Sequence, residues 1–386
     1  MGAPDRLGER LATRLAAIEA AGLRRTLTPP AGVDLASNDY LNLAADPRVV
    51  ARTADAIAEL GVGSTGSRLL RGEREATRRV ESRFAAFAGT ERALYFSSGY
   101  LANLAVISTF AEAGDLIVSD ALNHASLIDG MRLSRASRVI APHADPAALD
   151  ALLASHSGSG QAFVITESLF SMDGDEAPLA AYVEICRRHG AALVVDEAHA
   201  VGVYGERGTG LVEAQGVAEG VWLTINTAGK ALGVSGAFVA GDAAAIEYLV
   251  QRGRPFIFST AAPPALAAAI ETSLEIVAAE PDRRRRVLER AGLLRDLLAA
   301  RGVPVRPGRS QIVPVVLGEN ERAVRVARTL QARGFDVRAV RPPAVPEGTA
   351  RLRVSVNAGL EPAVLEAFAD ALANACGQEA GCAVSS

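Results

Sequence analysis

The stretch AALVVDEAH, residues 191–199, decides the fold. It begins with five uninterrupted apolar residues and ends in acidic and polar ones. A strand that is apolar on both faces is typical of a parallel sheet buried between helices. Six similar runs flank it, separated by helical stretches: RALYFSS (92–98), DLIVSD (115–120), SRVIAP (137–142), QAFVITES (161–168), VWLTIN (221–226) and SGAFVAG (235–241). This alternation predicts an α/β fold, with a mostly parallel sheet covered by helices on both faces.

The remaining segments predict how the chain is divided. The first 30 residues or so have the pattern of an amphipathic helix that ends at the helix breakers Pro29 and Pro30. We expect four parts: an N-terminal arm (1–47), a large domain (48–262), a small C-terminal α+β domain (263–375) and a flexible tail (376–386).

The small domain combines one long helical stretch with several strands. The helical stretch follows Pro263 and Pro264 and runs to about residue 301. The strands are expected near QIVPVVLG (311–318), FDVRAVRPP (335–343) and ARLRVSVNA (350–358).

Composition narrows the classes of function. The 386 residues carry a net charge of −4 with interspersed signs, so we expect no nucleic-acid partner. There is no apolar signal core and no run of 18 uncharged apolar residues, so we expect a cytoplasmic protein that does not enter membranes. Because Cys186, Cys376 and Cys382 lack metal-ligand spacing, we expect neither disulfides nor a metal site.

Lysine is nearly absent from this chain. Of the 40 basic residues only Lys230 is a lysine, and the other 39 are arginines. Arginine stays protonated and cannot supply a free amine, whereas a buried lysine can lose its proton and condense with a carbonyl. Lys230 is therefore a candidate for chemistry that arginine cannot perform, and the alternative is a leftover surface lysine.

Three features are predicted to meet at the carboxyl edge of the sheet. Gly99 and Tyr100 begin a helix directly after a strand, which favours a phosphate site, although an ordinary helix cap explains them too. Asp196 ends the strand of the 191–199 stretch, where it could bind metal, cap a helix or face a cationic ring nitrogen. Lys230 lies in a glycine-rich turn after the next strand.

Pyridoxal 5′-phosphate (PLP) would use all three features. Lys230 would carry it as a Schiff base, Asp196 would keep its pyridine nitrogen protonated, and the helix start would hold its phosphate. His199 would bond the phenolic oxygen, and His124 would stack on the ring unless it is a structural loop histidine. We expect the other three histidines to be structural: His143, His156 and His189.

Motifs along nearly the whole chain resemble the α-oxoamine synthase family. They are SNDYLNL (37–43), GSTGSRLLRG (63–72), SSGYLANLAVI (97–107), NHASLIDG (123–130), ITESLFSMDGDEAPL (165–179), VVDEAHAVGVYGERGTG (194–210), TAGKALGVSGAFVAG (227–241) and RPPAVPEGTARLRVSV (341–356). The family consists of fold-type-I PLP transferases, which condense an amino acid with an acyl thioester while the carboxylate of the amino acid is lost as carbon dioxide. The resemblance therefore implies a PLP-dependent acyltransferase, and a homodimer with sites at the subunit interface.

The resemblance also implies roles for individual residues. Lys230, His124 and Asp196 are expected to carry the catalysis. Cofactor contacts are expected from Gly99, Tyr100, His124, Ser171, Asp196, His199, Thr227 and Lys230. Substrate contacts are expected from Arg24, Asn38, His124, Glu167, Ala344 and Arg353.

Three of the substrate positions carry specific expectations. Arg353 is expected to clamp the substrate carboxylate with its two-pronged guanidinium. Arg24, or its neighbour Arg25, is expected near the acyl substrate. Ala344 stands where the family often has threonine, so a hydroxyl contact is absent there.

Within the family, the short arm, SMDGD and RPPAVPEGTARLR most resemble the biotin-pathway member, which joins L-alanine to a pimeloyl thioester carried on coenzyme A or acyl carrier protein. Several alternatives stay open. One is a sister activity: glycine C-acetyltransferase, 5-aminolevulinate synthase or serine palmitoyltransferase. The others are an aminotransferase, a β-eliminating lyase and a catalytically silent PLP-bound subunit.

Overall fold

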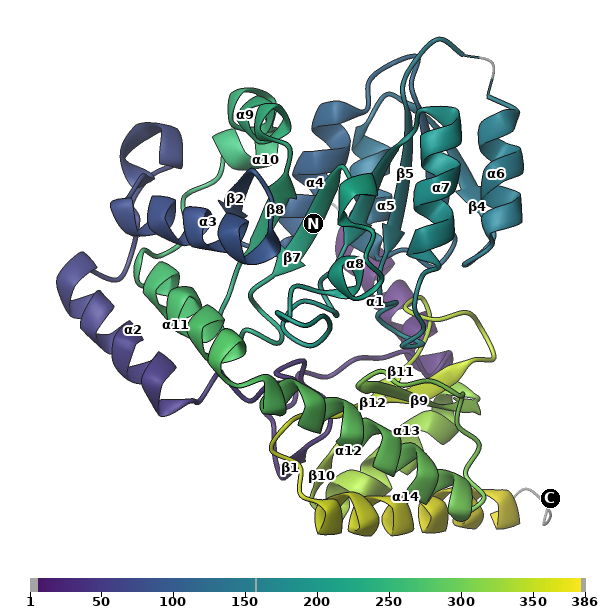
Figure 1. Cartoon of the computed structure of the whole chain (residues 1–386). Coiled ribbons are helices and arrows are strands. Elements are labelled where there is room, and N and C mark those ends of the chain that lie inside the picture. Colours follow the sequence, from purple (N-terminus) through teal and green to yellow (C-terminus); the bar gives the residue numbers. More distant parts are fainter. Residues whose placement is uncertain (1–5, 157, 383–386) are drawn as a thin grey trace, which may run out of the picture. The chain divides into compact units, whose positions relative to one another are not determined.

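Residues 6–156 and 158–382 are described here in a computed structural model (Figure 1). The chain forms two compact units. The larger unit comprises residues 38–288 and 357–359, and the smaller unit comprises the other described residues, before 38 and from 289 onward.

The larger unit contains a seven-stranded sheet in the spatial order β2-β8-β7-β6-β5-β3-β4. β8 is antiparallel to both of its neighbours, and the other neighbouring strands are parallel. All seven predicted apolar runs are strands of this sheet, which confirms the mostly parallel α/β fold. Their bounds are β2 (Arg92–Phe96), β3 (Leu116–Asp120), β4 (Ser137–Ala141), β5 (Ala162–Glu167), β6 (Ala192–Asp196), β7 (Leu223–Thr227) and β8 (Ala237–Gly241).

Helices cover both faces of this sheet (Figure 1). On one face, a buried apolar core joins the strands to α4 (Gly99–Phe110), α5 (Ala125–Leu133), α9 (Ala243–Arg252) and the short α10 (Arg254–Ile257). On the other face, Phe84 of α3 stacks on Phe238 of β8 with 4.1 Å between ring centroids. The helices on that side are α3 (Glu75–Ala88), α6 (Pro146–Ala154) and α7 (Leu179–His189), with the short α8 (Leu211–Ala214) and a 3₁₀ turn at Ala218–Gly220 nearby.

The division between the units differs from the predicted domain border at residue 263. The expected long helical stretch is two helices, α11 (Ala265–Ala279) and α12 (Pro281–Ala300), which meet at Glu280. α11 packs on α2 (Pro47–Leu60) through buried alanines, so it belongs to the larger unit and the division falls at residue 289. A π-helical turn at Arg68–Gly72 connects α2 to α3.

The smaller unit has its own sheet and core. Its antiparallel sheet has the order β11-β12-β9, and a separate pair of short strands, β1 and β10, is parallel. Leu294, Leu330 and Phe368 are fully buried in a core between this sheet and three helices. The bounds are β1 (Val33–Asp34), β9 (Ile312–Gly318), β10 (Phe335–Asp336), β11 (Ala339–Val340), β12 (Ala350–Ser355), α13 (Asn320–Ala332) and α14 (Pro362–Cys382), with the second half of α12.

The ends of the chain depart from expectation. α1 (Arg6–Ala20) stops well before Pro29, because Gly22 adopts a left-handed conformation (φ +64°) and the Leu23 N–H closes the helix on the Ile18 carbonyl at 2.9 Å. The predicted flexible tail overlaps α14, which continues to Cys382, and residues 383–386 lie outside the described part. No helix of the described residues is both long enough and apolar enough to cross a membrane.

Candidate active site

The candidate site lies at the carboxyl edge of the large sheet, where a cavity of about 300 Å³ opens. The direction in which successive strands are added to the sheet reverses between β3 and β5. β4 lies on the outer side of β3, while β5, β6 and β7 lie on the other side. Ligands of doubly wound sheets bind at such a switch point. Eight of the predicted site residues line the cavity: Gly99, Tyr100, His124, Glu167, Asp196, His199, Thr227 and Lys230.

Lys230 takes part in a chain of hydrogen bonds. Its Nζ lies 2.9 Å from His199 Nε2, and His199 Nδ1 lies 2.7 Å from the hydroxyl of Tyr40. Tyr40 is fully buried and donates to Asn38 Oδ1 at 3.0 Å. Lys230 is therefore held inside a polar site and is not a surface lysine; Tyr40 was not among the predicted site residues.

Asp196 ends β6, and both of its carboxylate oxygens are bonded. Oδ1 accepts the Ala198 N–H at 2.9 Å, and Oδ2 accepts the side-chain amide of Asn103 at 2.8 Å. The same Asn103 amide nitrogen also donates to Ser126 Oγ at 2.8 Å, so it ties α4 to α5. These donors fix the orientation of the carboxylate, and a carboxylate at this place can pair with a cationic ring nitrogen.

His124 caps the start of α5 beside Asp196. Its Nδ1 lies 2.7 Å from Ser126 Oγ and accepts the Ser126 backbone N–H at 3.3 Å. Burial lowers the pKa of His124; Asp196 opposes this shift, and the charge of Lys230 adds to it. The imidazole is therefore neutral at pH 7 and suited to stack on a ring.

Glu167 ends β5 and pairs in register with Asp196 of β6. Burial, and then the charge of Asp196, raise the pKa of Glu167 to about 8, so its carboxyl is mostly protonated at neutral pH. Its Oε2 accepts the Ser171 N–H at 3.1 Å, while Oε1 is buried without a hydrogen-bond partner among the described residues. The described lining of the cavity does not include Ser171, whose backbone instead holds Glu167.

The phosphate site was predicted at the start of α4. Ser98 caps the helix, with its Oγ accepting the Leu101 N–H at 3.3 Å, and the N–H groups of a first helical turn face outward. A Cβ on Gly99 would lie 2.6 Å from Cγ2 of Thr227, so only glycine fits there without a shift. Tyr100 is 42% exposed, and its hydroxyl bonds the carboxylate of Asp129.

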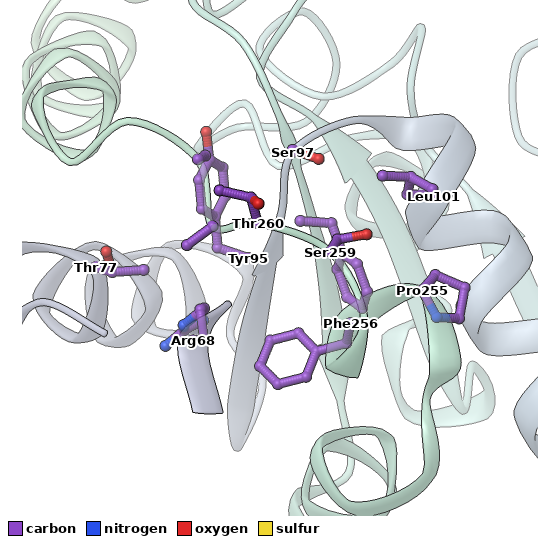
Figure 2. A pocket seen from close by; sticks show the side chains of 12 residues that line it. Arg68, Thr77, Tyr95, Ser97, Leu101, Pro255, Phe256, Ser259 and Thr260 are labelled. Atoms are coloured by element: carbon purple, nitrogen blue, oxygen red, sulfur yellow. The ribbon is translucent and has the colours of Figure 1, made fainter. Parts of the chain in front are cut away.

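The cavity fits PLP on the chemistry of its donors and acceptors. An amine, a carboxylate and a helix N-terminus surround one space, and Asn103 Oδ1 is a second buried acceptor without a partner in the described residues. A smaller cavity beside β2 has only about 30 Å³, room for about one water molecule. Figure 2 shows Tyr95, Phe256, Ser259 and Thr260 around that smaller space, which is too small for a cofactor.

The predicted substrate residues fall in both units. Asn38 belongs to the larger unit, whereas Arg24, Ala344 and Arg353 belong to the smaller one. Arg353 is nearly buried on β12 and donates to Ser355 Oγ at 2.7 Å. Arg24 forms an exposed ion pair with Glu19. Their roles toward a substrate stay predictions.

The comparisons with known proteins agree with one another. The sequence matches the family of class I and II aminotransferases over residues 30–372. It is 47% identical to an 8-amino-7-oxononanoate synthase of Anaeromyxobacter dehalogenans, with 96% of each chain covered. Among solved structures it resembles a serine palmitoyltransferase of S. paucimobilis with bound PLP–myriocin aldimine (TM-score 0.90, 31% identity, covering 98% of this chain and 99% of that chain). It also resembles an 8-amino-7-oxononanoate synthase of Francisella tularensis (TM-score 0.78, 29% identity, covering 90% and 98%).

Proposed function

The chain belongs to the class I and II aminotransferases and, within them, to the α-oxoamine synthases, and from this we propose that it catalyses the 8-amino-7-oxononanoate synthase reaction of biotin biosynthesis. L-Alanine and a pimeloyl thioester are joined by a new carbon–carbon bond, while the thiol and carbon dioxide leave. The observation that carries the proposal is the chain's sole lysine, Lys230, held by His199 at a cavity that Asp196 borders.

PLP bound to Lys230 supplies a ring that withdraws electrons from the α-carbon of the amino acid. Asp196 would hold the proton on the ring nitrogen, and the Asn103 amide and the Ala198 N–H orient its carboxylate. The neutral face of His124 would pack on the ring, and the start of α4 at Gly99 would bind the phosphate.

The chain's own residues also handle the protons and the substrate. Lys230 Nζ takes the α-proton of alanine, and His199 Nε2, 2.9 Å away, orients that amine. Glu167, protonated at neutral pH, presents a hydroxyl as a hydrogen-bond donor beside the substrate. Arg353 binds the substrate carboxylate, while Arg24 or Arg25 meets the acyl group. The enzyme acts as a cytoplasmic homodimer, with coenzyme A or acyl carrier protein as the thiol.

The test is thiol release by the PLP-loaded protein with L-alanine, glycine and L-serine, each against pimeloyl, succinyl, acetyl and palmitoyl thioesters. We expect release with alanine and pimeloyl thioester and loss of turnover in Lys230→Arg, which keeps the charge but not the reactive amine. Comparable turnover in Lys230→Arg would overturn the assignment.

A second candidate is a serine palmitoyltransferase, because the higher TM-score belongs to that class of structure. Release with serine and palmitoyl thioester would favour it. An aminotransferase would instead convert PLP to its amine form with alanine alone, and a silent subunit would release no thiol with any pair.

A further inference from the structure

Tyr40 connects the beginning of the larger unit to the reactive lysine. Its hydroxyl lies between Asn38 Oδ1 at 3.0 Å and His199 Nδ1 at 2.7 Å, and the opposite nitrogen of the same imidazole lies 2.9 Å from Lys230 Nζ. All four residues belong to the larger unit. The side chain of Tyr40 has no exposed surface, so water does not compete for the hydrogen bonds of its hydroxyl.

The backbone around Tyr40 fixes the position of the ring. The Tyr40 N–H donates to the Asn38 carbonyl at 2.8 Å, and the Tyr40 carbonyl accepts the Ala358 N–H at 2.8 Å. The side chain of Asp39 accepts the N–H groups of Leu43 at 2.8 Å and Ala44 at 3.0 Å, which closes the turn that follows. The hydroxyl is therefore held beside His199 by a rigid segment.

A single proton on the hydroxyl determines which atoms of the chain donate. When Tyr40 donates to Asn38, as found here, neutral His199 must donate from Nδ1, and its Nε2 accepts from the Lys230 amine. When Tyr40 donates to His199 instead, Nε2 carries the hydrogen and can donate to an oxygen in the cavity. The hydroxyl can serve either arrangement, and a phenyl ring can serve neither.

We propose that Tyr40 is a positioning residue whose hydroxyl sets the proton arrangement of His199, and through it the hydrogen bond offered to Lys230 and to the phenolic oxygen of PLP. This rests on the proposed function, since it requires PLP at Lys230. Under this proposal Tyr40 affects the cofactor only through the side chain of His199. Asn38, which bonds Tyr40, then affects the protonation of the cofactor in the same way.

The test is the pH dependence of the absorbance of bound PLP, measured without substrate in wild type, Tyr40→Phe, Asn38→Ala and the double variant. A donor on the phenolic oxygen stabilises the more negative, deprotonated cofactor. In Tyr40→Phe we therefore expect the midpoint of the change in PLP absorbance with pH to move to higher pH by about one unit, a tenfold change in the proton affinity of the bound cofactor. Asp196, Glu167 and His124 also face the cofactor, and every variant retains them.

The double variant separates coupling from packing. If Asn38 acts through the series of hydrogen bonds from Tyr40 to His199, Asn38→Ala shifts the midpoint by itself but adds no further shift once the Tyr40 hydroxyl is removed. Tyr182→Phe removes the hydroxyl of another buried tyrosine, in α7, and should leave the midpoint unchanged. Should Tyr40→Phe fail to fold, Asn38→Ala carries the same test.

The outcomes distinguish the two proposals. A wild-type protein that takes up no PLP overturns both. A wild-type protein that binds PLP at Lys230, shown by borohydride trapping and mass spectrometry, together with an unshifted midpoint in Tyr40→Phe, overturns only the role of Tyr40. Additive shifts of Asn38→Ala and Tyr40→Phe also overturn it.

Discussion

Replacing Asn103 by alanine tests the placement of the ring nitrogen against Asp196. The variant removes the 2.8 Å bond to Asp196 Oδ2 and leaves a carboxylate that is only 5% exposed with one donor fewer. A hydrogen bond to a charged group contributes about 1.5 to 3 kcal/mol. Because Asp196 is proposed to act on the ring when charge develops there, the lost energy should appear in the rate, and kcat should fall about 10- to 150-fold.

The assay for Asn103→Ala is thiol release at saturating alanine, with the KM for alanine and the affinity for PLP measured alongside. KM should change little, because Asn103 contacts Asp196 and Ser126. Asn226→Ala is the matched control: Asn226 is as buried, but its amide bonds Thr224, which precedes it by two residues on β7. Wild-type kcat in Asn103→Ala would refute the reasoning, as would an equal loss in Asn226→Ala.

Two further predictions concern the cavity walls. The pKa of Glu167 is raised from 4.5 to about 8, so the native state keeps a proton that the unfolded chain loses, and the free energy of unfolding should fall as pH rises from about 5 to 8. Glu167→Gln should reduce this fall in thermal melts. The same pH dependence in the variant as in the wild type would contradict the raised pKa. Gly99→Ala places a Cβ 2.6 Å from Thr227 Cγ2 and should weaken PLP binding about tenfold by fluorescence titration. Gly292→Ala, where a Cβ meets no atom within 4 Å, should bind PLP normally, and equal affinities in the two variants would argue against a phosphate at α4.

The sequence predicted the parts of the fold that depend on local pattern. Each apolar run of the large sheet is a strand, because a strand buried on both faces needs apolar residues throughout. The N-terminal helix was predicted too long: Gly22 ends it, and the conspicuous prolines lie further on, outside any helix or strand. The compact units divide at residue 289 and not at residue 263, because α11 packs on a helix about 200 residues earlier, and helical periodicity does not reveal which surface a helix meets.

The site, too, has residues that the sequence predicted and residues that it did not. Lys230, Asp196, His199 and His124 were predicted because each lies just after or at the end of a strand, where parallel topology gathers side chains. Tyr40 and Asn103 were missed because the contacts that tie them to the site are with side chains 159 and 93 residues away in sequence. For Asn103 the available signal was its position one turn after Gly99 on the same helix. Tyr40 lies within a motif already singled out, but its burial against His199 depends on tertiary packing.

The placement of the sole lysine has a practical consequence for handling the protein. A protease that cleaves only after lysine has one target within the chain, and that target is the residue proposed to carry PLP. Once the cofactor has been fixed there by reduction, the denatured chain should resist the protease, whereas chains without cofactor should yield two fragments. The ratio of intact chain to fragments on a gel would then report the fraction of molecules that carry PLP.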